Sequence, residues 1–151
     1  MGFILNKPLI DVSLEQIWTN IGYKKKKSYL TNEDVFVGGP LASNAMFVIH
    51  SPEYFIDKKT IKVCEEISVT GTKEITDDIQ KGQGPRKAIF LLGYSGWTPG
   101  QLEDEIMRDS WFVSEKFQSL IFSVDYQTKW TDALLLIGID PSKLSSYAGS
   151  S

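Results

Sequence analysis

Short stretches in which apolar and polar residues alternate recur along this chain, and they predict β-strands. The strongest signal is a continuous apolar run at residues 88–92, which predicts a buried strand. Further short strands are predicted at residues 2–5, 35–37, 47–49, 61–63, 67–69, 111–113 and 120–122. Because a glycine-containing loop joins residues 35–37 directly to residues 47–49, we expect these two strands to form an antiparallel pair.

Apolar residues at helical spacing lie between these strands. They predict helices at residues 13–22, 72–82, from residue 98 onward, and at 126–137. The last of these carries Trp130, Leu134 and Ile137 on one face. Helices and strands mix without a regular alternation of strand, helix and strand. The pattern therefore predicts an α+β fold with a mixed sheet.

The segment at residues 93–102 is the most informative part of the chain. It leads from the buried strand into a helix whose start has a clear signature, with Thr98 as N-cap, Pro99 in the first turn and Gln101 completing a capping box. Trp97 and Leu102 occupy the positions of a hydrophobic staple. A strand-to-helix junction is also where α/β proteins commonly bind ligands, so helix initiation and ligand binding are both open interpretations.

The length of 151 residues indicates a single domain, which we place at residues 1–141, followed by an irregular tail at residues 142–151. The formal net charge of −3 argues against general affinity for nucleic acid or anionic membranes. The one basic run, at residues 24–27, is typical of a solvated loop. We therefore expect no sequence-specific DNA binding and no membrane association. A cytoplasmic location is expected, because the N-terminus carries no signal peptide.

Candidate chemistry is sparse. His50 and Cys64 are the only imidazole and the only thiol, so one chain cannot assemble a zinc site of the common nitrogen and sulfur type. Both residues lie in strand-like surroundings, which is typical of packing residues. We identify no cofactor motif, no metal site and no catalytic residue. A hydrolase would require Ser95 as a nucleophile at the strand-to-helix turn, but the spacing departs from the nucleophile-elbow motif.

Five sequence blocks, spread over nearly the whole chain, resemble the AlgH/YqgE family of bacterial proteins. They occur in the family's order: GFILNKPL at 2–9, VFVGGPL at 35–41, FVIH at 47–50, LGYSGW at 92–97 followed by Gly100, Gln101, Leu102 and Glu105, and LIGID at 136–140. The resemblance implies a compact α+β fold with a mixed, partly barrel-like β-sheet flanked by helices. It also brings a label, transcriptional regulator, to a largely uncharacterised family without an established DNA-binding motif, reaction or cofactor.

Two departures from the family pattern affect the expectations. Family members usually have further strands before the first block, and this chain begins at that block. The sheet is therefore expected to have an incomplete edge, which could be covered by residues upstream of Met1 or by self-association. In addition, Ala45 and Met46 stand where the family usually has Arg-Gly or Gln-Gly, which weakens any site that relies on the arginine.

Three functional interpretations follow, and the favoured one is a non-enzymatic module that binds a small molecule or a protein. The expected binding residues lie on the glycine-bracketed loops and on the first block: Asn6, Lys7, Gly38, Gly39, Pro40, Tyr94, Ser95, Trp97 and Gln101. The alternatives are the transcriptional regulator that the family label implies and, with less support, a hydrolase that uses Ser95. We expect the two glycine-rich loops to border one shared cleft.

Overall fold

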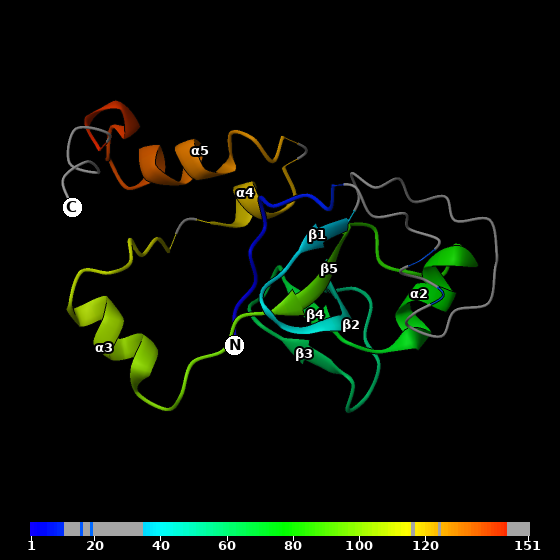
Figure 1. The fold of residues 1–151 in the computed structure, drawn as a ribbon. Coiled ribbons are helices and arrows are strands. Elements are labelled where there is room, and N and C mark those ends of the chain that lie inside the picture. Colours follow the sequence, from blue (N-terminus) through cyan, green and yellow to red (C-terminus); the bar gives the residue numbers. More distant parts are fainter. Residues whose placement is uncertain (11–15, 17–18, 20–34, 116, 124, 145–151) are drawn as a thin grey trace. The chain divides into compact units, whose positions relative to one another are not determined.

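The structure is a computed structural model, which describes residues 1–10, 16, 19, 35–115, 117–123 and 125–144. It divides into two compact units, residues 1–96 and residues 97–151, and each is described here by itself (Figure 1). The predicted helix at 13–22, apart from Gln16 and Thr19, and the lysine run at 24–27 lie outside the described residues.

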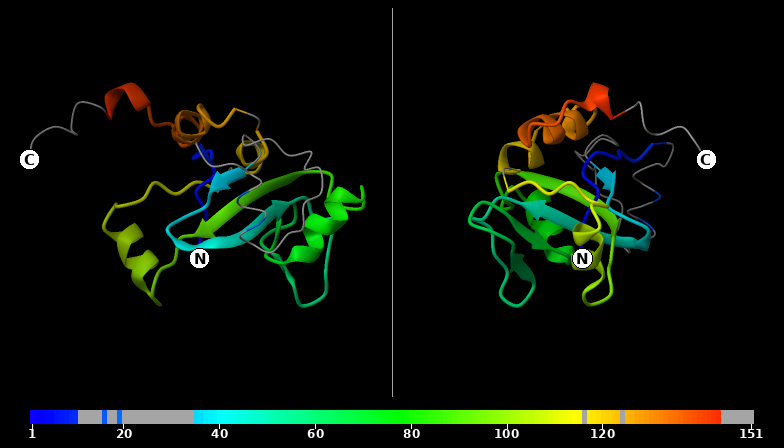
Figure 2. Two further views of the ribbon diagram at one scale, coloured as in Figure 1. Left: turned by 45° about the vertical axis from the view of Figure 1, so that its right-hand side comes forward. Right: turned by 90° about the vertical axis from the view of Figure 1, so that its left-hand side faces the viewer.

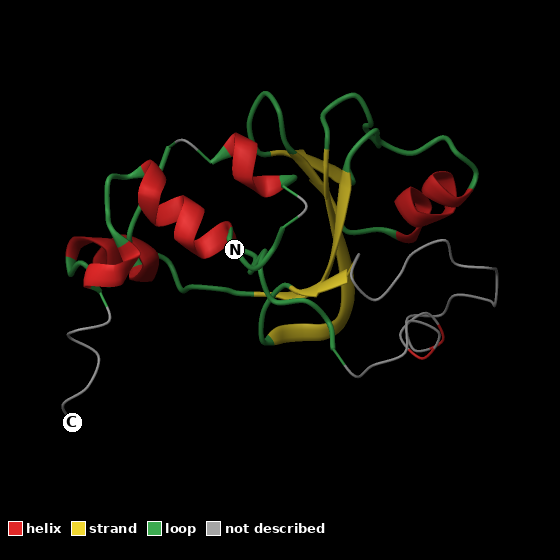
Figure 3. Cartoon of the chain, turned by 90° about the horizontal axis from the view of Figure 1, so that it is seen from above, coloured by secondary structure: helices red, strands yellow, loops and turns green. Residues whose placement is uncertain are grey.

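A five-stranded mixed sheet forms the first unit (Figure 3). Its order is β1 (Val35–Val37), β5 (Ala88–Tyr94), β2 (Leu41–His50), β4 (Ser68–Thr70) and β3 (Thr60–Lys62). The first pair in this order, β1 and β5, is parallel, and the other neighbouring strands are antiparallel. The structure confirms the predicted α+β class with a mixed sheet. The sheet is open rather than closed into a barrel, with β1 and β3 at its edges.

The predicted pairing of β1 with β2 is wrong, because β5 lies between them. Residues 89–92 of β5 are all buried and apolar, which is typical of a central strand with a hydrogen-bonded neighbour along each edge. The loop after β1 carries the chain past the end of β5, where the Gly38 N–H donates to the Leu92 carbonyl at 2.7 Å. Short sequence separation was therefore a misleading guide to pairing.

Residues 2–5 do not form the regular strand that the pattern predicts, but the segment 2–9 lies along the outer edge of β1. Isolated bridges join Gly2 to Ser95 and Pro8 to Phe36. The Leu9 N–H donates to the Val35 carbonyl at 2.9 Å. At the other edge of the sheet, β3 is only three residues long and includes Lys62, a residue type common on protected edges. Self-association through an incomplete edge stays a prediction.

The helix predicted from Thr72 is confirmed as α2 (Lys73–Gln80), with Thr72 as its N-cap residue. It packs beside the sheet (Figure 2), where its Ile75 joins the core cluster. The sheet supplies the other members of this cluster: Val35, Val48, Phe90 and Leu92. After the helix, Gly82 adopts a φ of 73°, which fits its predicted role at the helix end.

The second unit consists of short helices joined by irregular segments. They are α3 (Gln101–Met107), α4 (Gln118–Ile121), α5 (Lys129–Leu136) and the 3-10 turn η2 (Pro141–Lys143). The strands predicted at 111–113 and 120–122 are wrong. Residues 111–113 are irregular and exposed, and Leu120 belongs to α4. Three consecutive apolar residues without a neighbouring strand are not enough to form a ladder.

A buried lysine organises this unit, and sequence reasoning missed it. The Lys129 ammonium donates to the carbonyls of Leu120 at 2.8 Å, Ile121 at 2.8 Å and Ser123 at 2.9 Å. It thereby caps the C-terminal end of α4, where helical carbonyls have no partner within the helix. Burial lowers the pKa of Lys129.

The apolar face of α5 is buried only in part. Lys129 and Leu134 are buried, whereas Trp130 is 53% exposed. The three carbonyl partners explain why lysine, normally a surface residue, takes the buried position beside it.

Candidate functional site

The two glycine-rich loops of the first unit pack directly against each other, backbone to backbone. A Cβ on Gly39 would lie 2.2 Å from the Tyr94 carbonyl carbon, and one on Gly38 would lie 2.4 Å from the Gly93 oxygen. A Cβ on Gly93 would in turn lie 2.6 Å from the Gly39 oxygen. Real Cβ atoms do not come this close to backbone. Close packing of the chain therefore accounts for glycine at all three positions.

Neighbouring residues of this glycine junction, which we define as residues 38–40 and 93–95, are also held by the fold. The backbones of Ser95 and Gly2 exchange two hydrogen bonds of 2.8 Å. The Tyr94 ring packs edge-on against Phe47, with ring centroids 5.8 Å apart. Pro40 is exposed at the end of the turn.

The first block contributes two further predicted binding residues, Asn6 and Lys7, on the segment that runs along β1. Both side chains are exposed, and the Lys7 carbonyl accepts a hydrogen bond from the Val37 N–H at 2.8 Å. The structure thus brings Gly38 and Gly39 together with Tyr94 and Ser95. Ligand binding by this set stays a prediction.

Trp97 and Gln101, the other two predicted binding residues, belong to the second unit. The helix there begins later than predicted, because residues 98–101 form a type II turn. Gly100 has φ 82° and ψ −14°, and the Gln101 N–H donates to the Thr98 carbonyl at 3.0 Å. Pro99 and Gly100 are the residues that such a turn favours at its two central positions. One of the two hydrogen bonds of the predicted capping box is present: the Gln101 side-chain oxygen accepts from the Thr98 N–H at 3.0 Å.

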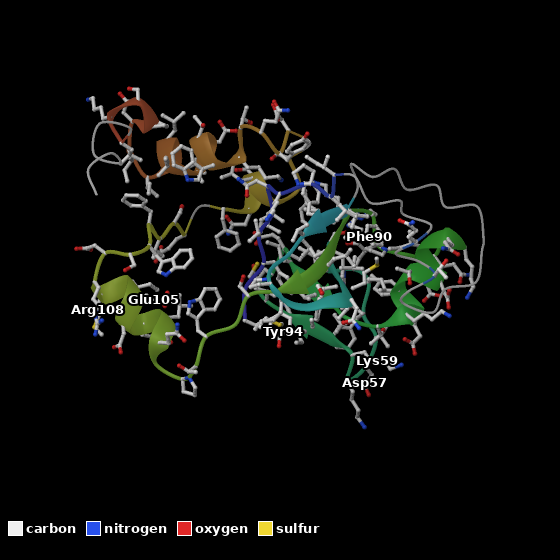
Figure 4. The ribbon with its side chains drawn as sticks, in the orientation of Figure 1. Asp57, Lys59, Phe90, Tyr94, Glu105 and Arg108 are labelled. Carbon is white, nitrogen blue, oxygen red and sulfur yellow. The ribbon has the colours of Figure 1, made fainter. Side chains whose placement is uncertain are left out.

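A carboxylate held by two indoles follows this turn (Figure 4). Glu105 on α3 accepts from the indole N–H groups of Trp111 at 2.7 Å and Trp97 at 3.0 Å, both through Oε2. Its other oxygen accepts from the Gln101 amide at 2.9 Å. The two indole rings meet edge to face, with centroids 5.9 Å apart. We call these four residues the indole–carboxylate cluster.

Three donors stabilise the charged form of Glu105. Hydrogen bonds from Trp111, Gln101 and Trp97 lower the pKa of its carboxyl group. A carboxylate with a lowered pKa and both oxygens occupied is suited to anchoring side chains and poorly suited to proton transfer. Sequence reasoning did not single out Glu105 as a site residue. The usable signal was its spacing of four from Gln101, which places both on one helical face.

His50 lies in a polar network inside the first unit, fully buried between the sheet and the loop that follows β2. Its Nδ1 lies 2.9 Å from the Ser51 carbonyl and must donate to it, because a carbonyl only accepts. Nε2 of the neutral ring then accepts from the Thr70 hydroxyl at 2.9 Å. Thr60 lies 2.7 Å from Thr70 and completes the chain of hydroxyl groups by donating to it.

Burial lowers the pKa of His50, so the neutral ring that this network requires is also the favoured one. The prediction that His50 is a packing residue agrees with this environment. Thr60 in turn accepts from the Ile56 N–H at 2.9 Å, so each neighbouring pair in the network has a donor and an acceptor.

Glu53 closes the same end of the sheet. Its carboxylate accepts from the Arg86 N–H at 2.6 Å and from the Ser51 hydroxyl at 2.7 Å. These two hydrogen bonds lower its pKa to about 2. The interaction joins the loop after β2 to the segment before β5 and extends the pairing of the two strands. Its role is structural.

In the described part of the chain, no group of three or more histidine, cysteine, aspartate or glutamate side chains is arranged to hold a metal ion. None of the helices among the described residues has the length and apolar character needed to cross a membrane.

Comparison with known proteins places these features in a family. A family model described as AlgH-like matches residues 1–142. A UPF0301 protein of Cereibacter sphaeroides is 40% identical over 149 residues, which cover 99% of this chain and 80% of that protein. A UPF0301 protein of a Methylobacterium species is 37% identical over 155 residues, covering 99% of this chain and 74% of the relative.

The solution structure of the AlgH protein from Pseudomonas aeruginosa has a similar fold. The TM-score is 0.74 at 24% sequence identity, and the match covers 100% of this chain and 79% of that protein. At this identity the similarity concerns the fold alone.

Proposed function

Because this chain belongs to the AlgH-like family, whose scaffold does not itself specify a reaction, we propose from its side chains that it is a non-enzymatic module that binds another protein. The observation that carries this proposal is the exposure of large apolar side chains in the second unit. Among its described residues only Lys129 and Leu134 are buried. Eight large apolar side chains are exposed: Ile106, Met107, Trp111, Phe112, Val113, Trp130, Leu135 and Leu136.

Five of these side chains fall within one stretch of eight residues. We define the apolar surface as Ile106, Met107, Trp111, Phe112 and Val113. Tryptophan, phenylalanine and methionine are enriched at protein interfaces, and aromatic residues supply most interface hot spots. Several large exposed apolar residues so close together are typical of an interaction surface rather than of ordinary solvent exposure.

The indole–carboxylate cluster prepares this surface for binding. Trp111 is 48% exposed, yet its indole N–H is fixed by Glu105 and its ring packs against Trp97. A side chain that is already held in one orientation loses little conformational entropy when a partner binds. Trp111 therefore has the properties of a rigid anchor.

The candidate catalytic groups of the first unit support a non-enzymatic role. His50 is buried and bonded on both ring nitrogens, so it is not placed to serve an exposed nucleophile. Ser95 belongs to a backbone segment that pairs with Gly2. Close backbone packing explains why glycine occupies positions 38, 39 and 93 of the glycine junction, without a bound ligand.

Site-specific photocrosslinking tests the proposal in living bacteria that express the protein. We expect p-benzoylphenylalanine at position 112 to give a discrete intermolecular product, identified by mass spectrometry, that disappears when Val113→Glu is added. Position 55 is the matched control, because Phe55 and Phe112 are both 61% exposed. Val63→Glu in the first unit controls for the added charge. No product at position 112, or the same products at both positions, would refute the proposal.

A further inference from the structure

The stretch that contains the apolar surface carries an excess of negative charge. Residues 101–115 contain five carboxylates and a single basic side chain, Arg108. Glu105 is occupied by the two indoles, which leaves Glu103, Asp104, Asp109 and Glu115 at the surface. The exposed part of this stretch is therefore acidic as well as apolar.

These four carboxylates form no ion pair with any of the described residues. Other carboxylates differ, because Glu53, Asp78, Glu74 and Asp140 each have a basic partner. Closely spaced like charges repel one another, and a cationic partner would relieve this repulsion. The charge pattern thus complements a partner of the opposite sign.

Trp111 adds a second reason for a cationic partner. Its indole N–H points to Glu105, so the exposed part of the side chain consists of the aromatic ring. The face of an indole ring attracts lysine and arginine side chains, with a strength of about 0.5–1 kcal/mol at exposed sites. A basic segment could therefore contact both the ring and the neighbouring carboxylates.

We propose that the partner of the apolar surface is a basic amphipathic segment of another protein, with leucine-like residues on one face and lysine or arginine beside them. The apolar residues would contact Met107, Phe112 and Val113, and the basic residues would contact Glu103, Asp109 and the Trp111 ring. This inference rests on the proposed function and specifies the chemistry of the partner.

Isothermal titration of the full chain with two synthetic helical peptides tests the inference. One peptide contains only leucine and lysine, and the other has glutamate in place of every lysine. We expect the leucine–lysine peptide to bind at least about 10-fold more tightly, because complementary charge favours it and like charge disfavours the other. Affinity should fall as salt rises, since exposed charges are screened.

Two variants identify the surface responsible. Glu103→Gln/Asp109→Asn should weaken binding of the leucine–lysine peptide about 5-fold, and Phe112→Ala should weaken it about 10-fold. Asp57→Asn/Glu65→Gln removes two exposed charges from the first unit and is the matched control. The inference would be overturned if the leucine–lysine peptide failed to bind. It would also be overturned if neither Glu103→Gln/Asp109→Asn nor Phe112→Ala weakened the binding.

The remaining outcomes separate the inference from the proposed function. If both peptides bind equally and Phe112→Ala weakens both, the apolar surface is a docking site but its partner is not basic. If the protein alone forms a dimer that Phe112→Ala dissociates, the occupant is a second copy of the chain and the inference is wrong. If, in addition, p-benzoylphenylalanine at position 112 gave no cross-linked product in the bacteria, the proposed function itself would be refuted.

Discussion

Gly39→Ala places a methyl group among backbone atoms that cannot easily move. The added carbon would lie 2.2 Å from the Tyr94 carbonyl carbon and 2.4 Å from the Ser95 nitrogen. Carbon atoms pack at about 3.5–4.0 Å, so relief requires a displacement of roughly 1 Å or more. Ser95 is held by two hydrogen bonds to Gly2, and the whole junction is continuous with β5.

The displacement would also affect hydrogen bonds of the preceding residue. The Gly38 N–H donates to Leu92 at 2.7 Å, and its carbonyl accepts from Ile4 at 2.8 Å. Overpacking costs about 1–3 kcal/mol. Weakening two hydrogen bonds adds about 1–2 kcal/mol. We therefore expect Gly39→Ala to lower the free energy of unfolding by about 3 kcal/mol, equivalent to about 6–12 °C in Tm.

Urea denaturation followed by far-UV circular dichroism measures this loss, with calorimetry for Tm. Gly96→Ala is the matched control. Its Cβ would come within 3 Å of one atom only, the Leu41 Cδ1 at 2.9 Å, which is the end of an exposed side chain. It should cost less than about 1 kcal/mol. If the two variants were equally stable, close backbone packing would not be the reason for glycine at position 39.

Other parts of the fold give predictions of their own. Thr70→Val removes the donor to a buried imidazole and should cost about 1–3 kcal/mol in urea denaturation, whereas Thr70→Ser should retain most of the stability. Burial lowers the pKa of His50 below its ordinary value of 6.5 in the folded state. Its contribution to stability is therefore present above pH 6.5 and is lost as the pH falls through the folded pKa. NMR titration of this single histidine checks the direction, and a folded pKa of 6.5 or higher would contradict it. Asp109 has a φ of 55°, so Asp109→Gly should raise the free energy of unfolding by about 1 kcal/mol, while Asp109→Val should lower it. Lys129→Met removes the ammonium that donates to three carbonyls and should cost about 2–4 kcal/mol, measured in the same way.

Local patterns predicted those elements whose formation depends on nearby residues. Residues 88–92 gave β5 because a continuous apolar run is stable only when it is buried. The helix α2 followed from Thr72, Ile75 and the glycine after its end. In each case the hydrogen bonds and the buried face are determined within about ten residues, which is the range that periodicity describes.

Pairing and burial depended on residues far apart in the sequence. The apolar run of β5 indicates a buried strand, but no local pattern shows that β1 and β2 are its two neighbours. Lys129 is buried because the end of α4 presents carbonyl groups to its ammonium, and the sequence had predicted a strand there. The helix start at Thr98 was misplaced because Pro99 and Gly100 favour a type II turn as well as a helix start.

The candidate site shows the same division between local and distant effects. The sequence identified Trp97 and Gln101 as candidates for helix initiation and for ligand binding, and in the structure both side chains bond to Glu105. Three residues of that part of the family signature have a structural role. Gly100 permits the turn, Gln101 links the turn to the helix, and Glu105 fixes the indoles.

The signature therefore builds a support for residues that lie outside it. Trp111 is held by Glu105, and Phe112 and Val113 follow it directly, yet none of the three belongs to the blocks that reveal the family. Residues that fix a scaffold are constrained by packing, whereas residues that contact a partner are constrained by that partner. If the module binds through residues 106–113, family members could share the support and differ in the surface it presents. The specificity of this chain would then reside in the apolar surface and its carboxylates rather than in the signature.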